Sequence, residues 1–250
     1  MLTPAPPVRI FRQECAEEIE KQGKDEYLKK VSLDWLHATT PYKYSYHFTW
    51  LGRPIIQFPT DIIAMQEIVW RVKPTVIVET GIAHGGSTIF YASMIELLKN
   101  NGRVISVDID IRKHNRVEIE RHPFFNHITM IEGSSIDEEI VAQIKSQIKP
   151  NDVVLVELDS CHTHEHVLRE LELYSPLVTK GSYLIVMDTI VNVMEGSPQG
   201  ERPWNKKNNP MTALNEWLKT EQASRFEVDR SIDDKLLISC APNGYLRCVR

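Results

Sequence analysis

Short apolar runs alternate with longer segments of helix-like composition along most of the 250-residue chain. The runs are rich in β-branched residues, which is typical of strands buried on both faces. They read TVIVET, RVISVDID, HITMIEG, DVVLVELD and GSYLIVMDT. Because helical segments separate them at regular spacing, we expect right-handed βαβ units. The alternation therefore predicts an α/β fold with a doubly wound, mostly parallel sheet.

The C-terminal part of the chain departs from this alternation. Asn209 followed by Pro210 predicts the start of a helix. The segments RFEVDR and KLLISCAPNGYLRCV follow closely, and the second contains the turn residues Pro-Asn-Gly. Together they predict an antiparallel strand pair that closes the sheet. Farther upstream, Ser135 with Glu138 three residues later predicts a capping box at a helix N-terminus.

The first sixty residues differ from the remainder. Helix-like spacing covers residues 10–36, and aromatic residues then gather among prolines in PYKYSYHFTWLGRPIIQFP. We therefore expect an N-terminal extension over residues 1–60 and one main domain over residues 61–250. The aromatic segment is either a loop packed on the surface or a lid or substrate wall, because rigid aromatic side chains line small-molecule sites.

The composition limits the classes of partner and the cellular compartment that we expect. The formal net charge of −5 gives no basic field for nucleic acid or an anionic membrane. Four cysteines form no C-x-x-C pair, which favours a reducing compartment. The N-terminus lacks a signal-peptide pattern, and no segment approaches the roughly 18 apolar residues of a membrane span. We expect a cytoplasmic protein that acts on a small molecule.

Acidic residues end the predicted strands. They are Glu79, Asp108, Glu132, Asp159 and Asp188. Ligands of open α/β sheets bind beyond the carboxyl ends of the strands, near the point where the strand order reverses. Acidic strand ends also occur as helix caps, but a ring of them exceeds what capping requires. The pattern therefore favours a ligand site at this edge.

The turn after the first strand constrains the cofactor. Its glycines, Gly81, Gly85 and Gly86, follow G-x-x-x-G-G rather than the G-x-G-x-x-G of dinucleotide enzymes. Glu79 just before them would repel a phosphate but would suit a sulfonium or amino group. The negative charge of Glu79 therefore favours S-adenosylmethionine over NAD. Asp108 could accept both ribose hydroxyls, with Asp110 as a competitor.

Several blocks of the sequence resemble the cephalosporin hydroxylase family, from about residue 45 to the C-terminus. The blocks are VIVETGIAHGGST, VISVDID, LVELDSCHTHEHVLRELELYSPLV, GSYLIVMDTIV and RPWNKKNNPMTALNEWL. The resemblance implies the Rossmann-like class I methyltransferase fold and the activity of an S-adenosylmethionine-dependent O-methyltransferase on a sugar or other secondary metabolite. It also implies a homo-oligomer, because relatives commonly assemble through their N-terminal segments.

The resemblance assigns the cofactor residues by position. Glu79 and Gly81 would hold the amino-acid end of S-adenosylmethionine, with help from Ser87. Asp108 would take the ribose, and Gly133 with Ser134 would lie near the adenine, although relatives often have an aspartate at position 134. Asp159 would lie at the edge of the cofactor.

The resemblance also implies a metal and a base. Asp159 and Asp188 would hold Mg²⁺, because carboxylate oxygens are its preferred ligands. Relatives have an acidic pair where this chain has Met187-Asp188, so a weaker site, a replacement ligand or no metal are all open. His162 matches a general base that would take the proton of a sugar hydroxyl. His164 and His166 are interpreted as supporting residues.

The polar segment EGSPQGERPWNKKNNP follows the fifth strand. It is either a mobile connection or a substrate lid, because long loops at this edge are often functional. As a lid it would contact the acceptor through Arg202, Trp204 and Asn209. The pair Lys206 and Lys207 is interpreted as solvated, with an anionic substrate group as the alternative.

Other functions compete with this interpretation. Three nearby histidines raise the possibility of zinc hydrolysis, but HTHEHVL is not H-E-x-x-H. Hydroxylation by iron is set aside because none of the nine histidines is followed two residues later by an acid. A methyltransferase acting on another nucleophile, and a non-catalytic cofactor-binding protein, remain open because of Met187.

Overall fold

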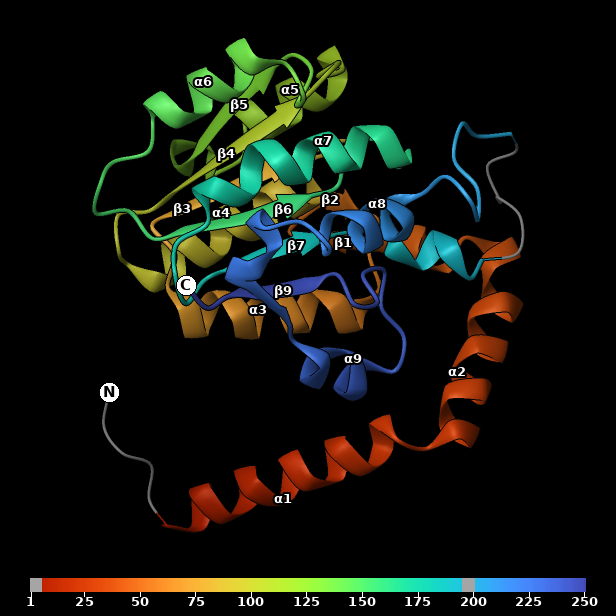
Figure 1. Cartoon of the computed structure of the whole chain (residues 1–250). Coiled ribbons are helices and arrows are strands. Elements are labelled where there is room, and N and C mark those ends of the chain that lie inside the picture. Colours follow the sequence, from red (N-terminus) through yellow and green to blue (C-terminus); the bar gives the residue numbers. More distant parts are fainter. Residues whose placement is uncertain (1–5, 195–200) are drawn as a thin grey trace.

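The computed structural model describes residues 6–194 and 201–250, and its centre is a seven-stranded sheet (Figure 1). The strand order is β5-β4-β3-β6-β7-β9-β8. Strands β3 to β7 run parallel, and β9 is antiparallel to both β7 and β8. The bounds are β3 Val76–Thr80, β4 Arg103–Asp108, β5 Ile128–Glu132, β6 Val154–Leu158, β7 Tyr183–Val186, β8 Phe226–Val228 and β9 Tyr245–Cys248. The predicted α/β fold, its mostly parallel sheet and its antiparallel C-terminal pair are confirmed.

Helices cover both faces of the sheet (Figure 1). Their bounds are α3 Pro59–Val72, α4 Gly86–Leu98, α5 Lys113–Glu120, α6 Glu138–Ser146, α7 His164–Tyr174, α8 Pro210–Trp217 and α9 Arg230–Leu236. Side chains of α3, α4, α5 and α9 form one apolar core with alternate strand residues, and those of α6, α7 and α8 form the other. Each central strand is buried on both sides, which explains why its sequence shows a continuous apolar run.

Strand order reverses between β3 and β6, which pair in parallel with Val76 opposite Val154, although these residues lie far apart in the sequence. Thr80 lies opposite Leu158 there, so the turns that follow the two strands come together. Gly81 has a φ of +93°, and a Cβ at this position would lie 2.0 Å from the carbonyl oxygen of Asp159. Only glycine allows this approach. The sheet thus creates the crevice in which α/β proteins bind ligands.

The N-terminal segment forms an arm along the outside of this body (Figure 1). It contains α1 Pro6–Gly23 and α2 Glu26–Thr39, and α1 contacts α9, where the Gln22 side chain donates to the carbonyl of Asp234 at 2.8 Å. Two short 3₁₀ helices, η1 Thr40–Tyr42 and η2 Tyr44–His47, lead to a hairpin of β1 Phe48–Trp50 and β2 Arg53–Ile55. The domain boundary at residue 60 and assembly through this arm stay predictions.

Within the described residues, no helix has both the length and the apolar character needed to cross a bilayer.

Two local predictions were wrong. The helix predicted to begin at Ser135 begins at Glu138, and its N-cap is Asp137, whose side chain accepts from the amide of Glu139. The Ser135 hydroxyl is engaged elsewhere, at 2.9 Å from His166 Nε2. The predicted strand segment KLLISCAPNGYLRCV is a strand only from Tyr245 onward. Its first two residues belong to the helix α9, which follows Asp229 and packs Ile232 into the core.

The approach of Gly81 to β6 can be tested by adding a single methyl group. Gly81→Ala combines an unfavourable positive φ with a clash against backbone, so we expect it to lower the free energy of unfolding by about 3 kcal/mol or more. Gly52→Ala is the matched control, because Gly52 also has a positive φ of +88° but no atom within 4 Å of the added Cβ. It should lose only about 1 kcal/mol. Equal losses in chemical denaturation would contradict the close approach.

Candidate active site

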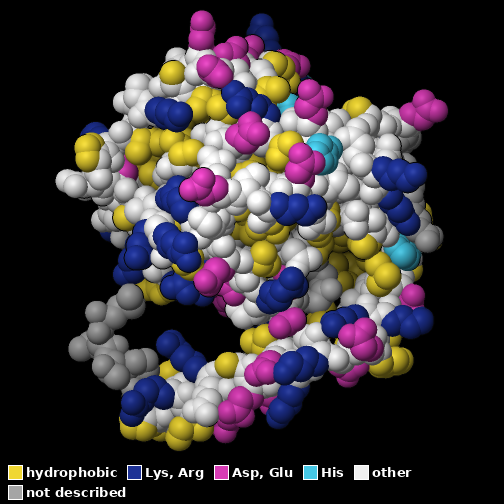
Figure 2. Space-filling model, in the orientation of Figure 1, with side chains coloured by type: hydrophobic (Ala, Val, Ile, Leu, Met, Phe, Trp, Pro, Cys, Tyr) yellow, Lys and Arg dark blue, Asp and Glu magenta, His cyan; other side chains and the backbone are white. Residues whose placement is uncertain are grey.

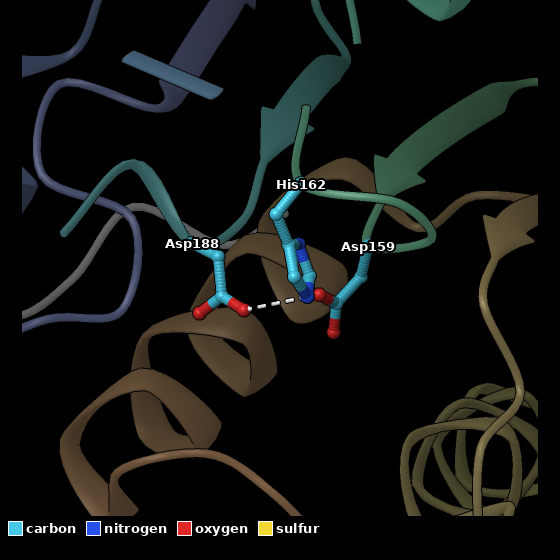
Figure 3. Close-up of side chains that lie close together, drawn as sticks. All are labelled: Asp159, His162 and Asp188. Carbon is cyan, nitrogen blue, oxygen red and sulfur yellow. Dashed lines mark ion pairs between the residues drawn. The ribbon is translucent and has the colours of Figure 1, made fainter. Parts of the chain in front are cut away.

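Three side chains converge where β6 and β7 end (Figure 3). Asp159 is the first residue after β6, and His162 lies in the loop between β6 and α7. Asp188 follows β7 and adopts a left-handed backbone with a φ of 54°. His162 Nε2 lies 3.1 Å from Asp188 Oδ2. One ligand atom from each of the three residues lies within 4.8 Å of the others. The structure thus brings together the predicted base and the predicted metal ligands.

The electrostatics of this cluster favour a cation. Burial raises the pKa of the Asp159 carboxyl well above its usual range, and the charges of Asp188 and Glu157 raise that pKa further. A divalent ion between the carboxylates would supply the opposite charge. Met187 contributes nothing to the cluster, because its side chain is 2% exposed and packs in the apolar core. The donor set that fits a metal is therefore Asp159, Asp188 and His162.

The three histidines of the β6–α7 connection have separate partners. His162 faces Asp188, and its ring meets the ring of Trp204 edge to face at 4.7 Å. His164 connects α7 to α8, with Nδ1 at 2.9 Å from Thr212 Oγ1 and Nε2 at 3.2 Å from Glu216.

His166 lies 2.9 Å from Ser135 Oγ, 3.1 Å from Ser160 Oγ and 3.6 Å from the buried carboxylate of Glu170. Three imidazoles directed at different partners do not form one zinc site. These contacts are all to other residues of the protein, and the supporting role of His164 and His166 stays a prediction.

A small pocket of about 40 Å³ lies beside the glycine turn after β3. Its wall includes Gly81, Ser87 and Asp159. Contact of these residues with the amino-acid end of a cofactor stays a prediction. Asp108 braces the same turn, because its Oδ2 accepts from the amides of Ile82 at 2.8 Å and Ala83 at 3.1 Å. Sequence reasoning missed this bracing. Binding of a ribose by Asp108 stays a prediction.

Glu79 lies beneath the turn and is fully buried. Its Oε2 accepts from Thr88 Oγ1 and Ser106 Oγ, both at 2.6 Å, whereas Oε1 has no partner among the described residues. Burial raises the pKa of Glu79 in spite of these hydrogen bonds. Glu79 lines neither pocket described here, so its contact with a cofactor stays a prediction.

Glu157 is a second buried carboxylate that sequence reasoning missed. It is the register partner of Glu79 on β6, and burial together with the charge of Glu79 raises its pKa. Gln57 contacts its Oε1 at 3.4 Å. The signal available in the sequence was an acid in the middle of an apolar strand, where an unpaired charge is unfavourable.

The predicted adenine side has a tight backbone. Gly133 donates its amide to the carbonyl of Asp108 at 2.8 Å. Its φ is +158°, and a Cβ there would lie 2.5 Å from the side chain of Ile140. Ser134 follows it in the connection to α6 and lines neither pocket. Contacts of Gly133 and Ser134 with an adenine stay predictions.

A large pocket of about 740 Å³ opens on the other side of the cluster, and His162 and Asp188 lie in its wall. Arg202 and Trp204 also line it, with the Arg202 guanidinium 5.4 Å from the centre of the Trp204 ring. The aromatic N-terminal segment forms the facing wall through Tyr44, Tyr46 and Phe58. Residues 195–200 of the expected lid lie outside the described residues.

Asn209 does not belong to this wall. Its side chain is fully buried and caps α8, accepting from the amide of Thr212 at 3.1 Å and donating to the carbonyl of Asn205 at 2.8 Å. Both ends of its side-chain amide thus bond within the protein. The predicted contact of Asn209 with an acceptor is therefore replaced by a role in holding the segment before α8.

Comparisons with known proteins identify related sequences and structures. The model of the family described as Rhamnosyl O-methyltransferase/CmcI matches residues 42–249. The rhamnosyl O-methyltransferase of Mycobacterium leprae is 31% identical over 203 residues, which are 79% of this chain and 82% of that protein. That of Mycobacterium tuberculosis H37Rv is 29% identical over 206 residues, 79% of this chain and 77% of that protein.

A solved structure also shares the fold. A structure of cmcI with Mg and SAM superposes with a TM-score of 0.57 at 18% sequence identity, and the match covers 82% of this chain and 78% of that chain.

The separate contacts of the histidines predict effects of different size on stability. His166→Ala should lower the free energy of unfolding by about 1–3 kcal/mol, because Ser135, Ser160 and the buried Glu170 each lose a partner. His162→Ala should change it by less than about 1 kcal/mol, since the pair with Asp188 is partly exposed. Chemical denaturation of both variants measures the difference. Equal losses would show that His162 is a structural residue.

Proposed function

This chain belongs to the rhamnosyl O-methyltransferase/CmcI family, and from that premise we propose that it transfers a methyl group from S-adenosylmethionine to a hydroxyl group of a sugar. One observation carries the proposal. Asp159 lines the small pocket, His162 and Asp188 line the large pocket, and the three side chains lie within reach of one another. A cofactor with its amino-acid end at the small pocket and an acceptor in the large one would therefore meet at this cluster.

The two pockets are neighbours, because Ile56 and Ala83 line both. Methyl transfer needs the attacking oxygen, the methyl carbon and the sulfur nearly in line, so positioning is most of the task. When bound, S-adenosylmethionine would supply the methyl group from a sulfonium, whose positive charge suits the carboxylates beside Gly81. The large pocket is of the size that small-molecule sites have, about 300–1,000 Å³.

His162 would act as the general base. Its Nε2 points toward the two carboxylates, where the acceptor hydroxyl has to lie for transfer (Figure 3). This role requires the neutral ring to carry its proton on Nδ1, which leaves the lone pair on Nε2. As the bond from oxygen to the methyl carbon forms and the carbon–sulfur bond breaks, Nε2 would take the hydroxyl proton. Asp188 Oδ2, 3.1 Å away, would stabilise the resulting imidazolium. Trp204 packs against the ring and limits its rotation.

Asp159 and Asp188 would hold Mg²⁺. Mg²⁺ keeps several waters and is commonly bound through one or two carboxylates, so the absence of an acid at Met187 does not exclude a site. When bound, the ion would lower the pKa of an acceptor hydroxyl and fix its position. His162 could instead be a third ligand of Mg²⁺. A base and a ligand differ in whether their loss changes the Mg²⁺ concentration that the enzyme requires.

The proposed function predicts both binding and turnover. Calorimetry should detect binding of S-adenosylmethionine and none of NAD, because the glycine turn is preceded by Glu79 rather than adapted to a pyrophosphate. Mass spectrometry should then detect a methylated product with a rhamnosyl acceptor from a panel of sugars. No heat with S-adenosylmethionine would refute the proposal. Binding without any methylated product would favour another nucleophile or a non-catalytic protein.

Titration with Mg²⁺ separates a base from a ligand. If His162 is the base, His162→Ala should lower kcat by about 10²–10³-fold and leave the half-saturating Mg²⁺ concentration unchanged. Asp188→Asn should raise that concentration about tenfold or more, since it removes a charged ligand. His164→Ala is the matched control and should change neither value strongly. A rise in the Mg²⁺ requirement of His162→Ala equal to that of Asp188→Asn would make His162 a ligand.

A further inference from the structure

The large pocket has an excess of positive charge that the whole chain lacks. The chain has 29 Lys and Arg against 34 Asp and Glu, which gives a formal net charge of −5. Among the described residues, Asp188 is the one carboxylate in the pocket wall. The cationic side chains of the wall are Lys43, Arg112, Arg202, Lys206 and Lys207. A cleft lined by one sign of charge concentrates ligands of the opposite sign.

These cations have no acidic partner in the ranges 6–194 and 201–250. The ion pairs of these ranges involve other residues, such as Lys30 with Asp34 and Lys235 with Glu67. Lys and Arg are interspersed with Asp and Glu over the face drawn in Figure 2. Arg202 stacks on Trp204 rather than on an acid. Within the described ranges, no acid neutralises the charge of these cations.

Most of this charge lies on the acceptor side. Arg202, Lys206 and Lys207 belong to the segment before α8, which also carries Trp204 and so packs against His162. Lys43 lies opposite, between η1 and η2. Arg112 is the N-cap residue of α5, just after the end of β4, and we assign it to the cofactor side.

We infer that the acceptor is a sugar bearing a phosphate or diphosphate group, which Lys43, Arg202, Lys206 and Lys207 bind. The inference rests on the proposed function, because it names the acceptor class of the same pocket. A phosphate group carries a charge of about −1.5 to −2 at neutral pH and offers oxygens to several donors. It therefore matches several cations without an acidic partner among the described residues better than a single carboxylate does. Tyr44, Phe58 and Trp204 provide apolar contacts for the sugar ring.

Calorimetric binding tests this inference without requiring turnover. The ligands are rhamnose 1-phosphate and a nucleoside-diphosphate rhamnose, with methyl rhamnoside as the neutral match and glucuronic acid as the carboxylate. Both phosphate ligands should bind at least about tenfold more tightly than methyl rhamnoside, the effect of one or two charged hydrogen bonds. The difference should shrink at about 0.5 M NaCl, because salt screens exposed charges.

A double variant locates the binding group. Lys206→Gln with Lys207→Gln should raise the Kd of rhamnose 1-phosphate about tenfold and leave that of methyl rhamnoside unchanged. Lys145→Gln with Lys219→Gln is the matched control, because these exposed lysines lie outside the pocket and the net charge changes equally. The control should bind both ligands as the unmodified protein does.

Three outcomes would overturn the inference. They are equal binding of rhamnose 1-phosphate and methyl rhamnoside, an equal loss in the control variant, and binding of glucuronic acid as tight as that of the phosphate ligands. Failure of the proposed function looks different. In that case S-adenosylmethionine does not bind, or no acceptor is methylated, while the phosphate ligands bind as expected. Such a result would support the anion-binding site and refute methyl transfer.

Discussion

The site depends on how closely the backbone after β3 approaches the backbone after β6. The Asp159 amide donates to the Thr80 carbonyl at 2.9 Å, and the Gly81 amide donates to the Val107 carbonyl at 2.7 Å. Asp108 then accepts from the next two amides of the turn. The ends of three neighbouring strands are thus joined by hydrogen bonds before any ligand is present. A residue placed directly after one of these strands is held by the sheet itself, which gives the positional precision that methyl transfer requires.

Acidic and basic side chains lie on different sides of this edge of the sheet. Glu79, Glu157 and Asp159 lie at its inner side, where burial raises the pKa of each. Such burial is unfavourable unless opposite charge is supplied. A sulfonium and a divalent ion are both cations, so the proposed ligands would supply this opposite charge. The outer wall has the opposite sign, through Lys206 and Lys207 among others. The proposed cationic donor would therefore lie beside Asp159 at the small pocket, and the proposed anionic acceptor beside the lysines of the large pocket.

Much of the fold and part of the site could be predicted from the sequence. Alternating strand and helix patterns gave the sheet and its faces, and the rule that ligands bind at the carboxyl ends of strands pointed to Asp159 and Asp188. Local competition between polar groups could not be predicted. Ser135 has the right spacing for a cap, but it contacts His166, which lies 31 positions later. Asn209 could have contacted a substrate or capped a helix, and its complete burial decides for the cap.

Long-range packing also determined the acceptor wall. Lys43 and Tyr44 precede the main domain in sequence, yet they face the segment that holds Lys206 across the large pocket. No pattern within either segment indicates this meeting, because it depends on where α2 ends relative to the sheet. Lys206 and Lys207 are a solvated pair when only their neighbours in sequence are considered. They become a candidate anion site once the wall opposite them is known.

Met187 lies where the family resemblance implied an acidic residue, and its place in the fold explains how the proposed metal site could do without that acid. Met187 donates its amide to Leu158 at 2.9 Å and continues the path of β7, so its side chain packs in the core. Asp188 then takes a left-handed conformation, which Asp tolerates better than most residues. This change of direction brings its carboxylate to His162 and out of the core. A methionine at position 187 therefore stabilises the sheet edge while the next residue serves the site. The resemblance implied one more acidic ligand at position 187, but the two proposed ligands, Asp159 and Asp188, follow adjacent parallel strands, whose separation the sheet fixes.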